Sequence, residues 1–224
     1  MADSEKQTVV SRPSQRTEVP DPEPEVERGP LDRAGTQWSR FAARLLDVLL
    51  RPQRFWRDVR REEIAIRELL FPHLVILIGV LAGAGFIGQL LGDAGFGSAV
   101  GQLVTSFVSW FAMVGVFAIV AGSIASAKGA RLSMSDSMRY AAYGLTPLFV
   151  VGVFSAIPLP HVAPIAGLIA MPWAFYVLSA GVVPCLGIST ERSAPIAGLM
   201  CGATLILWTI MPTLLPELVA AITK

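Results

Sequence analysis

Long apolar stretches without a formal charge divide the chain after Glu68. A helix needs about 20 apolar residues to cross a bilayer, and these stretches are long enough: Leu69–Gly92, Ala94–Ala127, Tyr140–Thr190 and Ser193–Pro216. The third is too long for one crossing. PLPHVAP (158–164) predicts a turn that divides it into spans at about 140–158 and 163–185. We therefore predict an all-α, polytopic integral membrane protein with five transmembrane helices.

Two of these stretches contain irregular features. The second is longer than one crossing requires, so its beginning, AGFGSAVG, is predicted to be mostly loop. The third opens with AAYGLTP, where Pro147 removes a helix hydrogen bond. In a membrane, neighbouring helices and a hydroxyl such as that of Thr146 can satisfy the carbonyl that proline frees. We expect a kinked helix here that Pro158 and Pro160 end.

Three residues before Pro147 should shape how this helix packs. Gly144 has no side chain and allows another backbone to approach. Tyr140 and Tyr143 suit the membrane interface, where the ring is apolar and the hydroxyl is wet.

The N-terminal part of the chain is polar. Residues 1–36 are rich in Pro, Glu, Ser and Arg, which is typical of a disordered tail. They contain no apolar core of a signal peptide, so insertion is predicted to begin at the first internal apolar segment. Residues 37–68 form a basic amphipathic juxtamembrane segment, and residues 69–222 form the five-helix domain.

The juxtamembrane segment begins with QWSRFAARLLDVLLRP, whose apolar residues recur at helical spacing up to Pro52. We predict an interfacial helix on the membrane surface, with the residues Trp38, Phe41, Leu45 and Leu49 on its apolar face. The following FWRDV interleaves Phe55, Trp56 and Val59 with arginines, which also favours the membrane surface. The alternative is that the segment packs against the protein's own loops.

The distribution of Lys and Arg predicts the orientation. Bases are frequent before the first span and occur in the second and fourth loops, but the first and third loops have none. Cytoplasmic loops are enriched in Lys and Arg. We therefore place the N-terminus in the cytoplasm and the C-terminus outside.

The sequence offers few residues for catalysis or metal binding. Cys185 and Cys201 lie in apolar surroundings and read as small buried residues, and two distant histidines, His73 and His161, do not favour a zinc site. GAGFIG (83–88) spells a dinucleotide fingerprint but falls inside an apolar span, so it indicates close helix packing through small residues. We predict no catalytic residue, no cofactor, no metal and no nucleic-acid partner.

A weak polar stripe runs along the first two spans, formed by Gln89, Gln102, Thr105, Ser106 and Ser109. It is compatible with a path for an uncharged solute or lipid. Hydrogen bonding between helices is the simpler explanation. No Asp, Glu, Lys or Arg lies deep in a predicted span, which argues against an ion-coupled carrier.

Several short motifs resemble the Ypt/Rab-interacting protein (YIP) domain family in its bacterial form. They are RPQRFWRDV before the first span, AAYGLTP at the start of the third and IPLP at its end, within residues 48–222. The resemblance implies a membrane domain whose motif positions are Pro52, Phe55, Tyr143, Gly144, Pro147 and Pro158. In eukaryotes it implies binding to prenylated small GTPases in Golgi and endoplasmic-reticulum trafficking.

The combined expectation is a non-enzymatic multi-pass protein of a bacterial cytoplasmic (inner) membrane. Its partners are the lipid bilayer and other membrane proteins or further copies of itself, and it binds proteins or organises the membrane. The alternative is a channel, scramblase or transporter for an uncharged solute or lipid.

Overall fold

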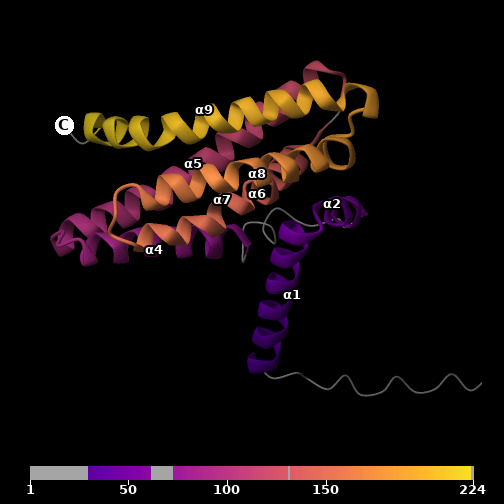
Figure 1. Cartoon of the computed structure of the whole chain (residues 1–224). Helices are drawn as coiled ribbons and strands as arrows, with labels where there is room; N and C mark the ends of the chain where they lie inside the picture. The colour runs from indigo at the N-terminus through magenta and orange to yellow at the C-terminus, as the bar shows by residue number, and fades with distance from the viewer. Residues whose placement is uncertain (1–29, 62–72, 131, 223–224) are drawn as a thin grey trace, which may run out of the picture.

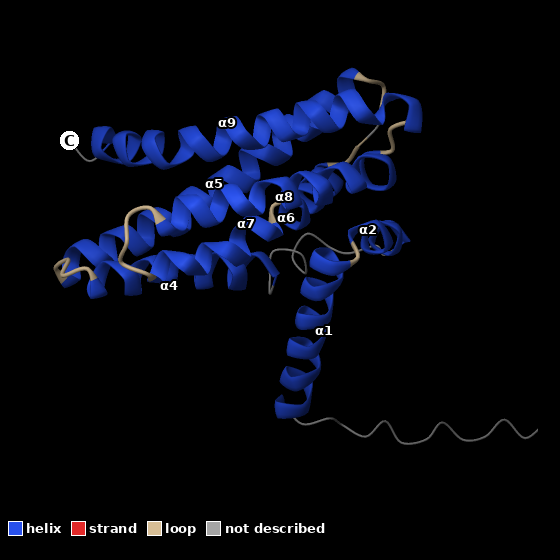
Figure 2. Cartoon of the chain, in the orientation of Figure 1, coloured by secondary structure: helices blue, strands red, loops and turns tan. Residues whose placement is uncertain are grey.

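The structure, a computed structural model, describes residues 30–61, 73–130 and 132–222. Residues 1–29 of the predicted tail, the end of the juxtamembrane segment (62–68) and the start of the predicted first span (69–72) lie outside the described residues. The rest of the predicted tail, 30–36, is helical, so the tail boundary at residue 36 is wrong. The elements are all helical (Figure 2): α1 Pro30–Leu50, α2 Pro52–Arg61, α4 Val75–Leu91, α5 Phe96–Ala127, α6 Met134–Gly144, α7 Thr146–Val151, the 3-10 helix η2 Gly152–Ala156, α8 Val162–Leu186 and α9 Thr190–Ile222.

The apolar helices form a bundle in which α4, α5, α8 and α9 run roughly along a common direction (Figure 1). Helix α5 contacts α4, α6 and α9, while α8 contacts α9 and the α6–α7–η2 segment. Helix α1 runs across this direction, and α2 packs on α8 (Figure 1). The amphipathic helices α1 and α2 contact each other and lie against α7 and α8 of the bundle.

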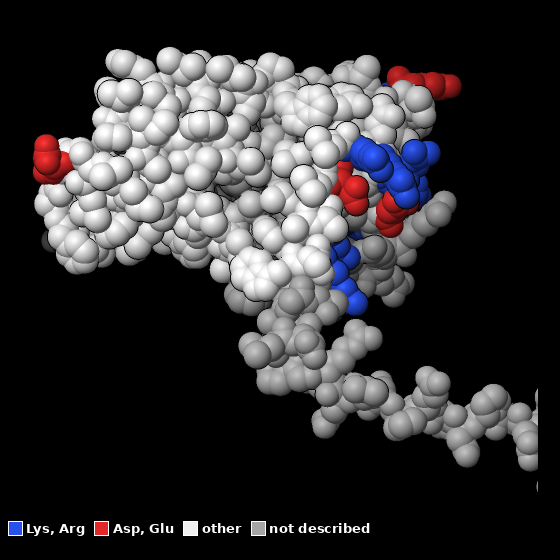
Figure 3. Space-filling model, turned by 60° about the horizontal axis from the view of Figure 1, so that its bottom comes forward, with Lys and Arg blue, Asp and Glu red and all other residues white. Residues whose placement is uncertain are grey.

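The two ends of the bundle differ in charge. We call the end with α2 and the α5–α6 and α8–α9 connections the charged end, since it contains Lys128, Asp136, Glu191 and Arg192. The opposite end, the far end, has the α4–α5 and η2–α8 connections and the C-terminal part of α9, with Asp93 in its α4–α5 connection. The surface between them is almost free of charged side chains in the view of Figure 3. This distribution fits a protein whose middle lies in lipid.

Among the described residues, three helices are long and apolar enough to cross a membrane on their own: Phe96–Ala127, Val162–Leu186 and the Thr190–Met211 part of α9. Helix α4 is shorter, with 17 residues. The segment predicted as the third span is divided between α6, α7 and η2. The all-helical class and the membrane character are thus confirmed, whereas the number of five spans stays a prediction.

The helix breaks where the third span was expected to kink. Helix α6 ends at Gly144, Leu145 is a turn residue, and Pro147 lies in the first turn of α7. Proline is tolerated there because the first N–H groups of a helix have no partner inside the helix. The Thr146 hydroxyl donates to the Ala142 carbonyl (3.1 Å), one residue before the carbonyl that Pro147 leaves without its usual donor.

Two predicted boundaries are wrong. Helix α6 begins at Met134, not Tyr140, because Ser133 and Asp136 form a capping box that satisfies its first N–H groups. Helix α5 begins at Phe96, so most of AGFGSAVG is helical rather than loop. The glycines at that end of α5 do not break the helix. Gly97 and Gly101 are exposed, and a Cβ on either would meet no atom within 4 Å.

Small-residue packing of the first span is confirmed at one position. A Cβ on Gly88 would overlap the backbone carbonyl of Ser155, so α4 and η2 approach closely there. Gly79 and Gly83 have open space and take no part in such a contact. The close approach therefore belongs to the end of GAGFIG and not to the whole motif.

Candidate functional site

An aromatic cluster joins α2 to the bundle near the charged end. We define it as Phe55, Trp56, His73, Tyr140 and Tyr143, with the ring centroids of Phe55 and Tyr143 4.8 Å apart, those of His73 and Tyr143 4.6 Å apart and those of Trp56 and Tyr140 5.7 Å apart. All five side chains are buried. They come from α2, the residues before α4, and α6, which are distant in the sequence.

Hydrogen bonds fix the polar atoms of these rings. The Trp56 indole Nε1–H donates to the Val177 carbonyl (2.9 Å), and the Tyr140 hydroxyl donates to the Leu178 carbonyl (2.9 Å). An Arg44 guanidinium nitrogen lies 3.4 Å from the Tyr143 hydroxyl. Each buried polar group that leaves water without a partner costs free energy, so these bonds make burial of the rings possible.

Two glycines allow the rings and helices to approach. A Cβ on Gly181 of α8 would lie 2.7 Å from Cε2 of Trp56 and 2.9 Å from Cε2 of Tyr140. A Cβ on Gly144 would overlap the Leu178 side chain. The expected close approach at Gly144 is thus confirmed, although it involves a side chain and not a second backbone.

The structure brings most of the motif positions together. Phe55, Tyr143 and Gly144 lie in or against the aromatic cluster, while Pro52 begins α2 and Pro147 begins α7, both buried. Pro158 is exposed in the η2–α8 connection at the far end. Tyr140 and Tyr143 are buried, with carbonyl and arginine partners for their hydroxyls inside the protein, and their place at the depth of the membrane interface stays a prediction.

The sequence analysis did not identify a buried imidazole–hydroxyl pair. His73 Nε2 lies 3.2 Å from the Thr146 hydroxyl, and Thr146 is fully buried. The hydroxyl already donates to the Ala142 carbonyl of α6. The pair therefore links the residues before α4 to the start of α7.

The predicted apolar face of α1 is divided in the structure. Phe41 and Leu45 pack partly against the core and Val48 is fully buried, while the Trp173 indole N–H donates to the Leu49 carbonyl (3.0 Å). The exposed apolar residues of α1 are Trp38, Leu46 and Leu50. Helix α2 packs on the protein as the alternative expected, although on helices of the bundle and not on loops. Phe55, Trp56 and Val59 are buried, while Arg54, Arg57 and Arg60 are exposed.

A second feature is a polar groove toward the far end. We define it by the residues that line more than one of its adjoining cavities: Gly85, Gln102, Ser106, Trp110, Ser155, Ala163 and Trp208. The cavities measure about 240 Å³ between α5 and α9, about 450 Å³ between α4, α5, α8 and α9, and about 370 Å³ beside the η2–α8 connection. Gln102 lines all three, so the cavities adjoin at this side chain, and we call them together the polar groove.

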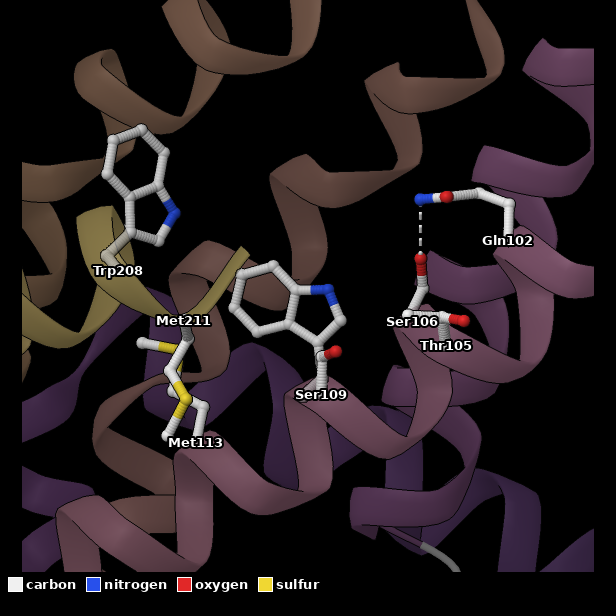
Figure 4. Close-up of a pocket in the computed structure, with 8 residues that line it drawn as sticks. Gln102, Thr105, Ser106, Ser109, Met113, Trp208 and Met211 are labelled. Carbon is white, nitrogen blue, oxygen red and sulfur yellow. Dashed lines mark hydrogen bonds between the residues drawn. The ribbon is translucent and has the colours of Figure 1, made fainter. Parts of the chain in front are cut away.

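Side chains from one face of α5 supply most of its polar groups. In Figure 4, Gln102, Ser106 and Ser109 project on one side of α5, with Trp208 and Met211 of α9 beside Met113 at the other part of the cavity. Gln102 Nε2 donates to Ser106 Oγ (3.1 Å). The spacing i, i+4, i+7 places these three residues on one helix face.

The groove ends inside the bundle. Met113 is buried and Phe117 is fully buried, while Trp110 packs edge to face on Phe149 with ring centroids 5.7 Å apart. Phe117 stacks in turn on Tyr140 of the aromatic cluster (6.2 Å). A continuous packed layer therefore separates the groove from the charged end.

The predicted polar stripe thus forms part of a real cavity lining. Gln102, Thr105, Ser106 and Ser109 line the cavity between α5 and α9, and Gln89 lines the one beside the η2–α8 connection. The sequence analysis missed Trp110, Ser155 and Trp208. Nothing local marks them, because their role depends on which helices become neighbours.

The described residues offer little for metal or thiol chemistry. Within residues 30–61, 73–130 and 132–222, no three His, Cys, Asp or Glu side chains gather into a group that could hold a metal ion. Cys185 and Cys201 are partly buried free thiols.

Together these features define a helical membrane protein with a packed, aromatic charged end and a polar groove toward its far end. The chain belongs to the Yip1 domain family, whose family model matches residues 46–211. The matched region includes α2, all three motif segments and the groove. A search of the curated proteins and a search of the solved structures each found no match.

Proposed function

We propose that this protein is a non-enzymatic multi-pass membrane protein that presents α1 and α2 as a basic platform for partner proteins. The observation that carries the proposal is the way α2 is held. Its apolar side is buried in the aromatic cluster, while Arg54 and Arg57 are exposed on the opposite side. Figure 3 shows basic side chains gathered near one end of the molecule. A rigidly held, charged helix favours recognition because little ordering is required on binding.

The proposed topology has five crossings, formed by α4, α5, the α6–α7–η2 segment, α8 and α9. With five crossings, the connections alternate between the charged end and the far end. Basic residues concentrate at cytoplasmic surfaces, which supports a cytoplasmic charged end with the N-terminus inside and the C-terminus outside. The resemblance to the bacterial form of the family supports a bacterial cytoplasmic (inner) membrane.

In this orientation α1 lies across the bundle direction, roughly in the plane of the membrane surface (Figure 1). Its exposed apolar residues Trp38, Leu46 and Leu50 then rest on lipid, which refines the predicted interfacial helix. A cysteine replacing Leu46 should react with a water-soluble maleimide more slowly than one replacing the neighbouring exposed Asp47. Equal rates in inverted vesicles would place this side of α1 in water.

Partner recruitment tests the main proposal. We expect that proteins crosslinked to the full chain in native membranes are lost when Arg54 and Arg57 are replaced by Gln, because the platform loses two exposed charges. The matched control replaces Lys128 and Arg192 by Gln, which removes two exposed charges from other parts of the charged end. A deletion of residues 1–29 leaves α1 intact and separates the tail from the platform.

The measurement is quantitative mass spectrometry of the crosslinked proteins. Loss in the Arg54/Arg57 variant but not in the Lys128/Arg192 variant supports the platform. Partners that survive both replacements and disappear only with residues 1–29 would assign recognition to the tail instead. The same partners in every variant contradict the proposal.

A second candidate is movement of an uncharged solute or lipid, favoured by the polar groove. Met113 and Phe117 are buried between the groove and the charged end. A solute or lipid could cross the protein along the groove only after this layer rearranges. Robust flux or lipid scrambling by the purified protein in liposomes would favour this candidate over the scaffold.

A further inference from the structure

The polar groove lies within an otherwise apolar part of the molecule. Exposed Val104 and Val108 of α5 and Ile206 of α9 lie on the same helices as its lining. The groove begins about 9 Å along α5 at Gln102 and reaches about 20 Å along it at Ser109, at 1.5 Å per residue from Phe96. A hydrocarbon core is about 30 Å thick, so the groove reaches well below the membrane surface and its natural occupant is a lipid.

The lining excludes a charged head. None of the residues that line the three cavities is Asp, Glu, Lys, Arg or His. Taking a phosphate into such surroundings without a paired cation is costly. An uncharged head with hydrogen-bonding groups fits the lining instead.

The hydrogen bonds already made in the groove determine which donors and acceptors the head group of a bound lipid needs. The hydroxyls of Ser155 and Thr209 donate to carbonyls of their own helices, Gly152 (2.7 Å) and Leu205 (2.8 Å). Their oxygens therefore face a ligand as acceptors, which need a donor. Ser106 Oγ accepts from Gln102 and keeps its own hydrogen to donate. A ligand hydroxyl meets both requirements, since it donates and accepts.

The rest of the lining suits a hydrocarbon chain. Trp110, Met113, Trp208 and Met211 supply the apolar part of the cavity between α5 and α9, whose polar part is Gln102, Thr105, Ser106 and Ser109. Cavities of about 450 and 370 Å³ lie in the range that small-molecule sites occupy. The groove therefore combines a polar section near Gln102 and Ser155 with an aromatic and thioether section deeper in the bundle.

We propose that the polar groove binds a membrane lipid with an uncharged alcohol head, of the diacylglycerol class. The head hydroxyl lies between Ser155 and Gln102, and an acyl chain follows Trp110 and Trp208. This proposal concerns a site remote from α1 and α2, so it does not depend on partner recruitment.

Photocrosslinking in proteoliposomes tests it with the full chain. The probe is a diacylglycerol carrying a photoactivatable, clickable acyl chain, compared with a phosphatidylglycerol that carries the same chain. Replacing Gln102 by Leu and Ser106 by Val should lower capture of the diacylglycerol about five-fold or more, since two weak hydrogen bonds in a membrane together are worth roughly that factor. Replacing Val104 and Val108 by Leu is the control on the exposed side of α5 and should leave capture unchanged.

Further readouts make the result decisive. Peptide mapping should place the crosslink on α5 or α9 near Trp110 or Trp208. If the Gln102/Ser106 variant does not fold, Ser155→Ala removes one acceptor with little change in volume and should also lower capture. Equal capture of both probes overturns the uncharged head, and unchanged capture in the folded groove variants overturns the site. Crosslinked partner proteins at α1 and α2 should be the same in these variants, so a failure here leaves the proposed function standing.

Discussion

Replacing Trp56 by Ala should destabilise the protein by about 3–5 kcal/mol, the range for removing a large aromatic side chain from a core. Trp56 is fully buried, contacts Phe55, Tyr140 and Tyr143 and donates to the Val177 carbonyl. Its loss leaves a cavity between α2 and α8 and releases α2. For a chain of this size the Tm in detergent should fall on the order of 10 °C.

Two controls separate the causes of this loss. Trp38→Ala removes the same side chain from a position that is 57% exposed and should change the Tm little. Trp56→Phe keeps most of the ring contacts but removes the hydrogen bond to Val177, which is worth about 1 kcal/mol. Limited proteolysis of α2 should accelerate in Trp56→Ala and not in Trp38→Ala. Equal Tm values for the Trp56 and Trp38 variants would show that α2 is not held by this side chain.

Replacing Gly181 by Ala should also destabilise the protein, although alanine favours helices. The added Cβ would lie within 3 Å of ring atoms of both Trp56 and Tyr140. These rings are held by their own hydrogen bonds and cannot yield easily, so overpacking should cost about 1–3 kcal/mol. Gly198→Ala in α9 is the matched control, because its Cβ meets no neighbour within 4 Å, and it should leave the Tm unchanged or raise it.

A double variant tests whether the two effects share one cause. In Trp56→Ala with Gly181→Ala, the new methyl group occupies space that the indole has left. The two losses should therefore be less than additive, as expected for residues in direct contact. Additive losses, measured as Tm shifts in detergent, would place the effect of Gly181→Ala elsewhere in α8.

The helical class and the order of apolar segments could be predicted from the sequence because they depend on local composition. Charge-free stretches and the turn at 158–164 locate α4, α8 and α9 closely. The start of α6 was misplaced, since its capping box Ser133–Asp136 lies among polar residues that read as loop. The start of α5 was misplaced because glycine-rich sequence is compatible with both loop and membrane helix.

The aromatic cluster could not be predicted for a different reason. An amphipathic basic segment presents the same pattern whether its apolar side meets lipid or protein, and Phe55 and Trp56 happen to meet α6 and α8. The polar stripe on α5 was visible at helical spacing, but its cavity depends on Trp208 and Ser155 from other elements. Long-range contacts of this kind leave no local signal.

The protein is proposed to be a five-crossing bundle with its charged end in the cytoplasm. Labelling of single cysteines is the most direct test of this topology. With Cys185 and Cys201 replaced by Ala, single cysteines are placed at exposed Asp93 and Leu159 of the far end and at exposed Lys128 and Ser189 of the charged end. With this topology, a membrane-impermeant maleimide applied to intact cells should label positions 93 and 159. Positions 128 and 189 should react only in inverted vesicles. Labelling of positions 93 and 128 from the same side would contradict it.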